Sequence, residues 1–191
     1  MYAVKNLLLT LSLYLVAASA HAVEFKGVVG FGMDFGGDVL RSGTFSEGST
    51  WEAKANQGLV LNGGVVMITG AFETQATVGY KFGGPQAKNG SITFDEMPLE
   101  LMEFYRTSIF RMGLGIAYLN SPKLVVDIPT ESSTTKFDNA LAYVAQIGWA
   151  PEKSPFSIDL RYTIAKFKAS GVANAKDING NVVGLYMSYF F

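Results

Sequence analysis

The strongest constraint on the fold of this chain is an alternation of period two that recurs eight times after residue 22. In the stretch 156–165, large apolar side chains occupy the even positions, whereas small or polar side chains occupy the odd positions. Successive side chains of a β-strand point to opposite faces, so each such segment predicts a strand with one apolar face. The predicted strands cover approximately residues 25–35, 58–68, 71–82, 91–103, 110–119, 140–149, 156–166 and 182–191.

The connections between these segments alternate between long and short. The second, fourth and sixth connections are short, whereas the others are long and carry Gly, Ser, Asn, Lys and Asp. This rhythm, with strands of about 9 to 11 residues, is typical of antiparallel barrels that cross a membrane. We therefore predict an all-β, eight-stranded antiparallel up-and-down transmembrane barrel. An irregularity is expected at Glu96-Met97-Pro98, because proline cannot donate a hydrogen bond to the ladder.

Residues 1–22 have the layout of a secretory signal peptide. Lys5 is the only charged residue before an apolar run at 7–18, and the closing Ala-His-Ala fits the small-x-small rule of signal peptidase. The alternative is a membrane anchor, which would need about 18 to 20 apolar residues. We expect cleavage after Ala22, which leaves residues 23–191 as a single outer-membrane barrel domain.

A soluble barrel would also alternate, so the nature of the inner face decides between a soluble and a membrane protein. A lipocalin-like barrel holds its large apolar side chains inside. Here the face opposite the apolar one is rich in glycine, which suits the cramped interior of an eight-stranded membrane barrel. The inward glycines are Gly30, Gly32, Gly79, Gly113, Gly115, Gly148 and Gly184. Aromatic residues lie on the apolar face near strand ends, as interfacial girdles do: Phe25, Phe35, Phe72, Phe82, Tyr118, Trp149, Phe156, Tyr162, Tyr189 and Phe191.

The last predicted strand carries a pattern shared by membrane barrels. Tyr189 and Phe191 close a run with an apolar residue at every second position. This run resembles the C-terminal β-signal of bacterial outer-membrane proteins, which the barrel-assembly machinery reads. The chain after residue 22 resembles the small eight-stranded outer-membrane barrels, the class of the OmpA membrane domain, OmpX and OmpW. The resemblance implies a monomer in the outer membrane of a Gram-negative bacterium, in contact with lipid and lipopolysaccharide.

The composition disfavours most catalytic and metal chemistry. The single histidine, His21, lies in the predicted signal peptide, and the chain has no cysteine, so hard oxygen ligands alone remain for a metal. The enzymes of the resembled class share a need for a catalytic histidine. We therefore expect no enzyme, no metal and no cofactor; the enzymatic alternative is a serine activated by lysine or a carboxylate. A net charge of −1 gives no reason to expect nucleic-acid binding.

Charged residues on the inner face are the predicted functional positions. The alternation points three acids and three bases into the lumen, together with Gln75 and Gln146. A charge in a narrow interior must be paired or hydrated. We predict a salt-bridge network that plugs the lumen; the alternative is a gate in which exchange of pairs opens an ion path. The network consists of Glu73, Lys81, Glu100, Arg111, Asp159 and Arg161.

The remaining charges are assigned to strand ends and loops. Asp95 and Glu96 are adjacent and would face opposite ways on a strand, and we expect both to be solvated. Lys166, Lys168 and Lys176 make the last long connection basic, either as ordinary solvated lysines or as contacts for lipopolysaccharide phosphates. The predicted function is a non-enzymatic barrel with a plugged lumen, whose loops contact lipid or an external partner. The alternative is transport of a small hydrophobic solute, or of ions, as in the OmpW type.

Overall fold

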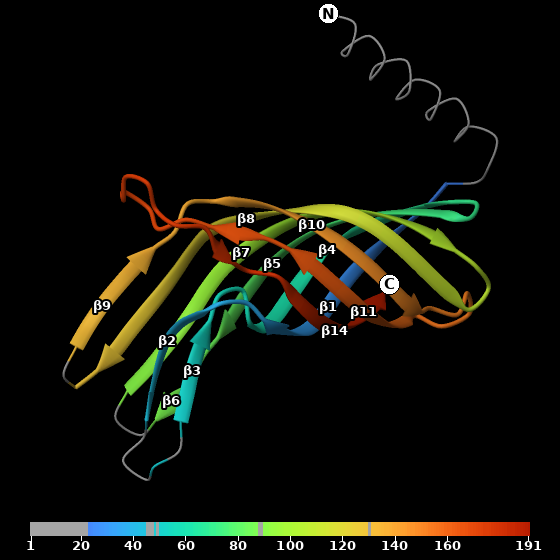
Figure 1. The fold of residues 1–191 in the computed structure, drawn as a ribbon. Helices are drawn as coiled ribbons and strands as arrows, with labels where there is room; N and C mark the ends of the chain where they lie inside the picture. The colour runs from blue at the N-terminus through green and yellow to red at the C-terminus, as the bar shows by residue number, and fades with distance from the viewer. Residues whose placement is uncertain (1–22, 45–47, 49, 88–89, 130) are drawn as a thin grey trace, which may run out of the picture.

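The computed structural model describes residues 23–44, 48, 50–87, 90–129 and 131–191, and the predicted signal peptide lies outside them. Eight antiparallel strands form a closed up-and-down barrel (Figure 1). All eight strands predicted from the alternation are confirmed. They are β1 (Val23–Gly36), β4 (Gly58–Thr69), β5 (Phe72–Gly83), β7 (Gly90–Arg106), β8 (Phe110–Ile128), β10 (Ala140–Trp149), β11 (Phe156–Ile164) and β14 (Val182–Phe190).

The barrel closes where the first and last strands meet. β1 pairs antiparallel with β14 in a register that places Val28 opposite Phe190. One step further, Gly27 and Phe191 exchange two backbone hydrogen bonds of 2.8 and 3.0 Å. An open sheet would leave a row of unpaired backbone groups at each edge, which lipid cannot satisfy. Closure at this seam removes both edges.

The outer wall of the barrel is apolar. Side chains such as Leu114, which is 70% exposed, face outward along every barrel strand. At the end with the short turns, Phe72 and Tyr105 meet edge to face at 5.8 Å, and at the other end the rings of Tyr80 and Phe82 stack at 5.8 Å. A continuous apolar wall between two aromatic belts is typical of a surface that contacts a bilayer rather than water. The belt at the short-turn end is called the lower belt, and the belt at the hairpin end is called the upper belt. Within the described residues, no helix has the length and hydropathy needed to cross a membrane.

Long hairpins project from one end of the barrel, and the short turns gather at the other (Figure 1). β8 continues past the wall to pair with β9, so the apolar stretch 124–128 is part of this strand extension. The additional strands are β2 (Val39–Thr44), β3 (Thr50–Lys54), β6 (Gln86–Ala87), β9 (Glu131–Lys136), β12 (Lys166–Phe167) and β13 (Ile178–Asn179).

The expected irregularity lies near Pro98, but the extra residue belongs to the neighbouring strand. The register between β7 and β8 shifts between Asp95 and Met97, where Glu96 alone faces Ser121 and Pro122 of β8. Ser121 has a positive φ of 52°, a conformation that suits a β-bulge. The bulge exchanges the parity of β8, so that its inward positions change from odd to even numbers.

An apolar cluster fills the hairpin end of the interior. The rings of Phe94, Phe137 and Phe167 lie 5.7 to 6.4 Å apart, and all three residues are buried. Such mutual ring contacts stabilise beyond the area that they bury. The side chains come from β7, from the connection after β9 and from β12, so the cluster holds the outer hairpins over the barrel.

Substitution of Gly64 tests how tightly the wall strands pack. A Cβ at Gly64 would contact the carbonyl oxygen of Ala76 and lie 2.8 Å from Cα of Thr77, so backbone would have to move. We expect Gly64→Ala to lower the free energy of unfolding by about 1–3 kcal/mol in urea titrations of the refolded barrel. The matched control is Gly63→Ala, where the nearest atom to an added Cβ is 3.6 Å away. Equal losses in the two variants would contradict this account.

Candidate functional site

All six side chains of the predicted network face the lumen. The alternation of each strand places them there, and the closed ring then brings residues from distant strands together. The structure groups them into three clusters. The first contains Glu73, Arg111 and Asp159, the second contains Glu100 and Arg161, and the third contains Lys81.

Arg111 is the centre of the first cluster and is 0% exposed. Its Nε and Nη2 donate to the two carboxylate oxygens of Asp159 at 2.8 and 2.7 Å, and its Nη1 donates to Glu73 at 2.6 Å. Nη2 also donates to the hydroxyl of Ser157 at 2.9 Å. Glu73 accepts a second hydrogen bond from Arg106 at 2.5 Å. The planar, forked guanidinium can satisfy several acceptors at once, which a lysine could not do in this geometry.

The first cluster crosses the lumen from wall to wall. Glu73 lies on β5 and Asp159 on β11, two strands that stand opposite each other in the ring, and Arg111 comes from β8 between them. The guanidinium also lies 4.4 Å from the ring centroid of Phe104 and 5.2 Å from that of Phe190. These cation–π contacts replace part of the hydration that a buried arginine loses. The cluster therefore connects opposite walls of the barrel near its short-turn end.

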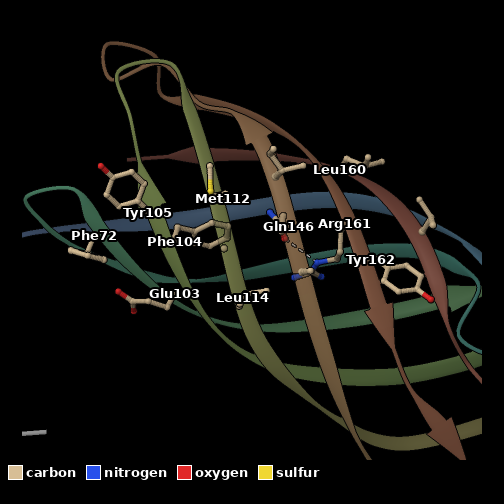
Figure 2. Close-up of a pocket in the computed structure, with 14 residues that line it drawn as sticks. Phe72, Glu103, Phe104, Tyr105, Met112, Leu114, Gln146, Leu160, Arg161 and Tyr162 are labelled. Atoms are coloured by element: carbon tan, nitrogen blue, oxygen red, sulfur yellow. Dashed lines mark hydrogen bonds between the residues drawn. The ribbon is translucent and has the colours of Figure 1, made fainter. Parts of the chain in front are cut away.

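Arg161 forms the second cluster with Glu100. Nη1 and Nη2 of Arg161 donate to the two oxygens of Glu100 at 2.9 and 2.8 Å, and Nε donates to Gln146 at 3.0 Å (Figure 2). The guanidinium lies 4.2 Å from the ring centroid of Tyr186. Glu100 also accepts a hydrogen bond of 3.3 Å from Thr77. This bidentate pair connects β11 with β7 across the middle of the lumen.

Lys81 holds two carboxylates in the third cluster. Its Nζ lies 2.8 Å from Asp34 and 3.2 Å from Glu96, and it also donates to the side chain of Asn56. The hydroxyl of Tyr186 donates to Asp34 at 2.8 Å. Tyr186 thus contacts both Arg161 and Asp34, and it joins the second cluster to the third.

The sequence interpretation missed three charged members of these clusters, Asp34, Glu96 and Arg106. Glu96 was expected to be solvated, and that was wrong: it is 0% exposed and lies beside Lys81, because β7 continues well beyond it and keeps it inside the wall. Asp95 does face the other way, 4.0 Å from Lys123. The parity of the alternation could have found Asp34 and Glu96, since both share the even numbering of the inward residues on their strands.

The geometry favours fixed ion pairs over reaction chemistry. The described lumen residues named above include five acids and four bases, and each acid contacts at least one of the bases. In the described part of the chain, no group of three or more His, Cys, Asp or Glu side chains could hold a metal ion. The hydroxyl of Ser157 is fully buried, donates to Asp159 at 2.8 Å and accepts from Arg111, so it has no open face toward a substrate.

Two outer hairpins are joined by an exposed ion pair. Nη1 and Nη2 of Arg41 on β2 donate to the carboxylate of Glu131 on β9 at 2.8 and 2.5 Å. These hydrogen bonds, assisted by one from Ser133, hold the pKa of Glu131 below its usual range. In the basic loop, Lys166 and Lys168 each lie 3.5 Å from Asp177 and are largely exposed.

No protein-family model and no curated protein matches the sequence. Several solved structures share the fold, among them two outer-membrane proteins. Neisserial surface protein A covers 89% of this chain and 99% of its own length, with a TM-score of 0.51 and 11% identity. The attachment invasion locus protein Ail of Yersinia pestis, in complex with the heparin analogue sucrose octasulfate, covers 88% of this chain and 99% of its own, with a TM-score of 0.52 and 14% identity. At such identities the likeness concerns the fold alone, and it confirms the architecture of the small eight-stranded outer-membrane barrels.

Removal of the guanidinium of Arg111 tests how much this group contributes to the stability of the fold. Arg111→Met keeps much of the volume but leaves Glu73 and Asp159 buried beside a neutral side chain. Because breaking one partner of a buried ion pair costs about 3–5 kcal/mol, we expect a loss of that size in the free energy of unfolding, measured by urea titration of the refolded barrel. The control is Lys166→Met, which removes an exposed charge and should cost far less. Similar stabilities of the two variants would contradict a stabilising role for Arg111.

The Arg41–Glu131 pair predicts a pH dependence of the outer hairpins. The pKa of Glu131 is lower in the folded protein, so the pair stabilises the hairpins fully above the unfolded pKa and is lost as the pH falls through the folded one. We expect Arg41→Gln to raise the pKa of Glu131 toward its usual value, as followed by carboxyl carbon NMR in micelles. Ser133→Ala, which removes the smaller contribution, should raise it less. An unchanged titration of Glu131 in Arg41→Gln would refute the assignment.

Proposed function

We propose that this chain is a non-enzymatic, monomeric barrel of the bacterial outer membrane, with a lumen closed by ion pairs and outer hairpins that contact lipopolysaccharide or an external partner. The observation that carries the proposal is the position of Arg111, which binds carboxylates from opposite walls of the barrel. The apolar wall and its aromatic belts support residence in a membrane, since such a surface would associate in water. In this role the barrel is a scaffold and its hairpins carry the binding surface.

The three charged clusters support a closed lumen over a gated one. Opening an ion path at the first cluster would require Arg111 to leave Asp159, Glu73 and Ser157 together. Each buried charged group left without its partner costs several kcal/mol, so exchange of one pair for another has a high barrier. Above the charges, the cluster around Phe94 fills the hairpin end with apolar side chains, which oppose a water column.

The fixed geometry of the outer hairpins supports a role in recognition. Besides the Arg41–Glu131 pair, the side-chain nitrogen of Asn56 donates to the backbone oxygen of Gly180 at 2.7 Å, and Asp38 accepts from the backbone of Asn179 at 2.8 Å. These contacts connect segments far apart in the sequence, so the hairpins form one platform. A rigid platform loses little entropy on binding a partner.

The exposed lysines at 166, 168 and 176 give this platform a basic edge. Phosphate groups of lipopolysaccharide have the complementary charge and lie at the level of the outer membrane surface. On the last strand, the outward rings of Tyr189 and Phe191 stack at 6.2 Å beside the seam with β1. Their exposure supports the proposal that the barrel-assembly machinery reads them while β14 is being joined to β1.

Conductance in planar bilayers tests the closed lumen. We expect the inserted wild-type barrel to show no discrete conductance steps at 100 mV, because the ion pairs and the apolar cluster leave no hydrated path. The double variant Arg111→Ala, Arg161→Ala removes both guanidinium bridges and should conduct measurably. Insertion of each protein is verified by its protection from external protease. Steps in the wild type that disappear in Arg111→Ala or Glu100→Ala would refute a plug and establish a gate.

A further inference from the structure

Glu103 is exceptional among the described residues of the barrel wall. It is the one charged side chain of the eight barrel strands that faces outward between the two aromatic belts. The other outward acids lie at or beyond the belt at the hairpin end: Asp95 pairs with Phe82 of that belt, and Asp127 lies on the extension of β8. Its strand neighbours on the same face are Leu101 and Tyr105, which are both exposed. An ionisable group in the lipid-facing region is costly to keep and therefore points to a function by default.

The position of Glu103 matches the level of lipid headgroups. In the register between β5 and β7, Glu103 pairs with Thr74, and the next outward pair is Phe72 with Tyr105, which belongs to the lower aromatic belt. Thr74 donates a hydrogen bond of 2.6 Å to the carboxylate of Glu103, which orients this group on the wall. Two residues of a tilted strand rise only about 5 Å, so the carboxylate lies just inside the interface.

A furrow of about 890 Å³ begins beside Glu103 and crosses the outer wall (Figure 2). The strand registers show that it lies between two rows of outward side chains, and its floor is formed by inward-facing residues such as Gly113 and Gln146, whose side chains do not project into it. The upper row is lowest at Ala145, which has a small side chain. Its far end is at Val183, near the start of β14, so the furrow climbs from the short-turn end of the wall toward the hairpin end. The lower row is Phe72, Tyr105, Met112, Ile147 and Leu160, and the upper row is Glu103, Leu114, Ala145, Tyr162 and Val183.

We propose that the furrow binds one phospholipid with a primary-amine headgroup, whose ammonium pairs with Glu103 and whose acyl chain lies in the furrow. The proposal rests on the barrel being embedded in a bilayer. Charge complementarity selects the headgroup, because the carboxylate favours a cation that can also donate hydrogen bonds. The apolar side chains of Met112, Leu114 and Leu160 select an acyl chain over a polar ligand. The level of Glu103 selects a lipid from the leaflet at the short-turn end of the barrel.

Native mass spectrometry of the full, refolded barrel tests this site. The micelles contain equal amounts of phosphatidylethanolamine and phosphatidylglycerol with identical acyl chains. We expect the wild type to retain the amine lipid about fivefold more often than the glycerol lipid, and we expect Glu103→Gln to abolish this preference. The matched control is Asp95→Asn, which removes another outward acid of the same strand and should keep the preference. Heat-dependent mobility on gels verifies that each variant is folded.

Filling the furrow tests the second half of the proposal. Ala145→Trp leaves Glu103 intact but places a large outward side chain in the furrow, so we expect fewer retained amine lipids than in the wild type. Equal retention of both lipids by the wild type, or an unchanged preference in Glu103→Gln, would overturn the headgroup site. Unchanged retention in Ala145→Trp would overturn the acyl-chain site. A dimer that is lost in Glu103→Gln would instead assign the surface to a second copy of the chain. None of these outcomes depends on conductance, so a failure here leaves the closed lumen unaffected.

Discussion

The buried guanidinium of Arg111 is the interaction on which the rest of the structure depends. An eight-stranded barrel has an interior just wide enough for side chains, so a charge placed there cannot be shielded by bulk water. In place of water, Arg111 contacts two acids from opposite walls, a serine hydroxyl and two aromatic rings. The same groups connect strands that stand opposite each other in the ring. The number of strands and their stagger set the width of the barrel, and the ion pairs fit within that width.

On the outer surface the membrane imposes the opposite rule, because lipid favours apolar side chains and cannot form hydrogen bonds with free backbone groups. The outer wall of the barrel is accordingly apolar, and the seam between β1 and β14 is closed. Against that rule, the outward carboxylate of Glu103 is a costly exception beside the furrow. Thr74 on the neighbouring strand donates a hydrogen bond to this carboxylate and orients it on the wall.

The ion pairs lie at the short-turn end and in the middle of the lumen, and the apolar cluster around Phe94 and Phe167 lies at the hairpin end. The closed lumen that we propose would leave binding to the hairpins and to the lipid-facing wall, which lie outside the charged clusters. The hairpins are themselves tied together by the Arg41–Glu131 pair, which gives them the fixed geometry that recognition needs.

The sequence by itself determined which way most side chains of the barrel strands face. The period of two is a local property of the strand, so it correctly predicted eight strands and the apolar wall, and Arg111 and Glu100 lie on the inner face that this period gives them. Which inward charges meet was decided by the tertiary structure, because partners such as Lys81 and Asp34 depend on the stagger of strands around a closed ring. The parity of β7 points Glu96 inward, whereas the burial of Glu96 depends further on the length of β7 and on the bulge in β8, which form only when the strands pair.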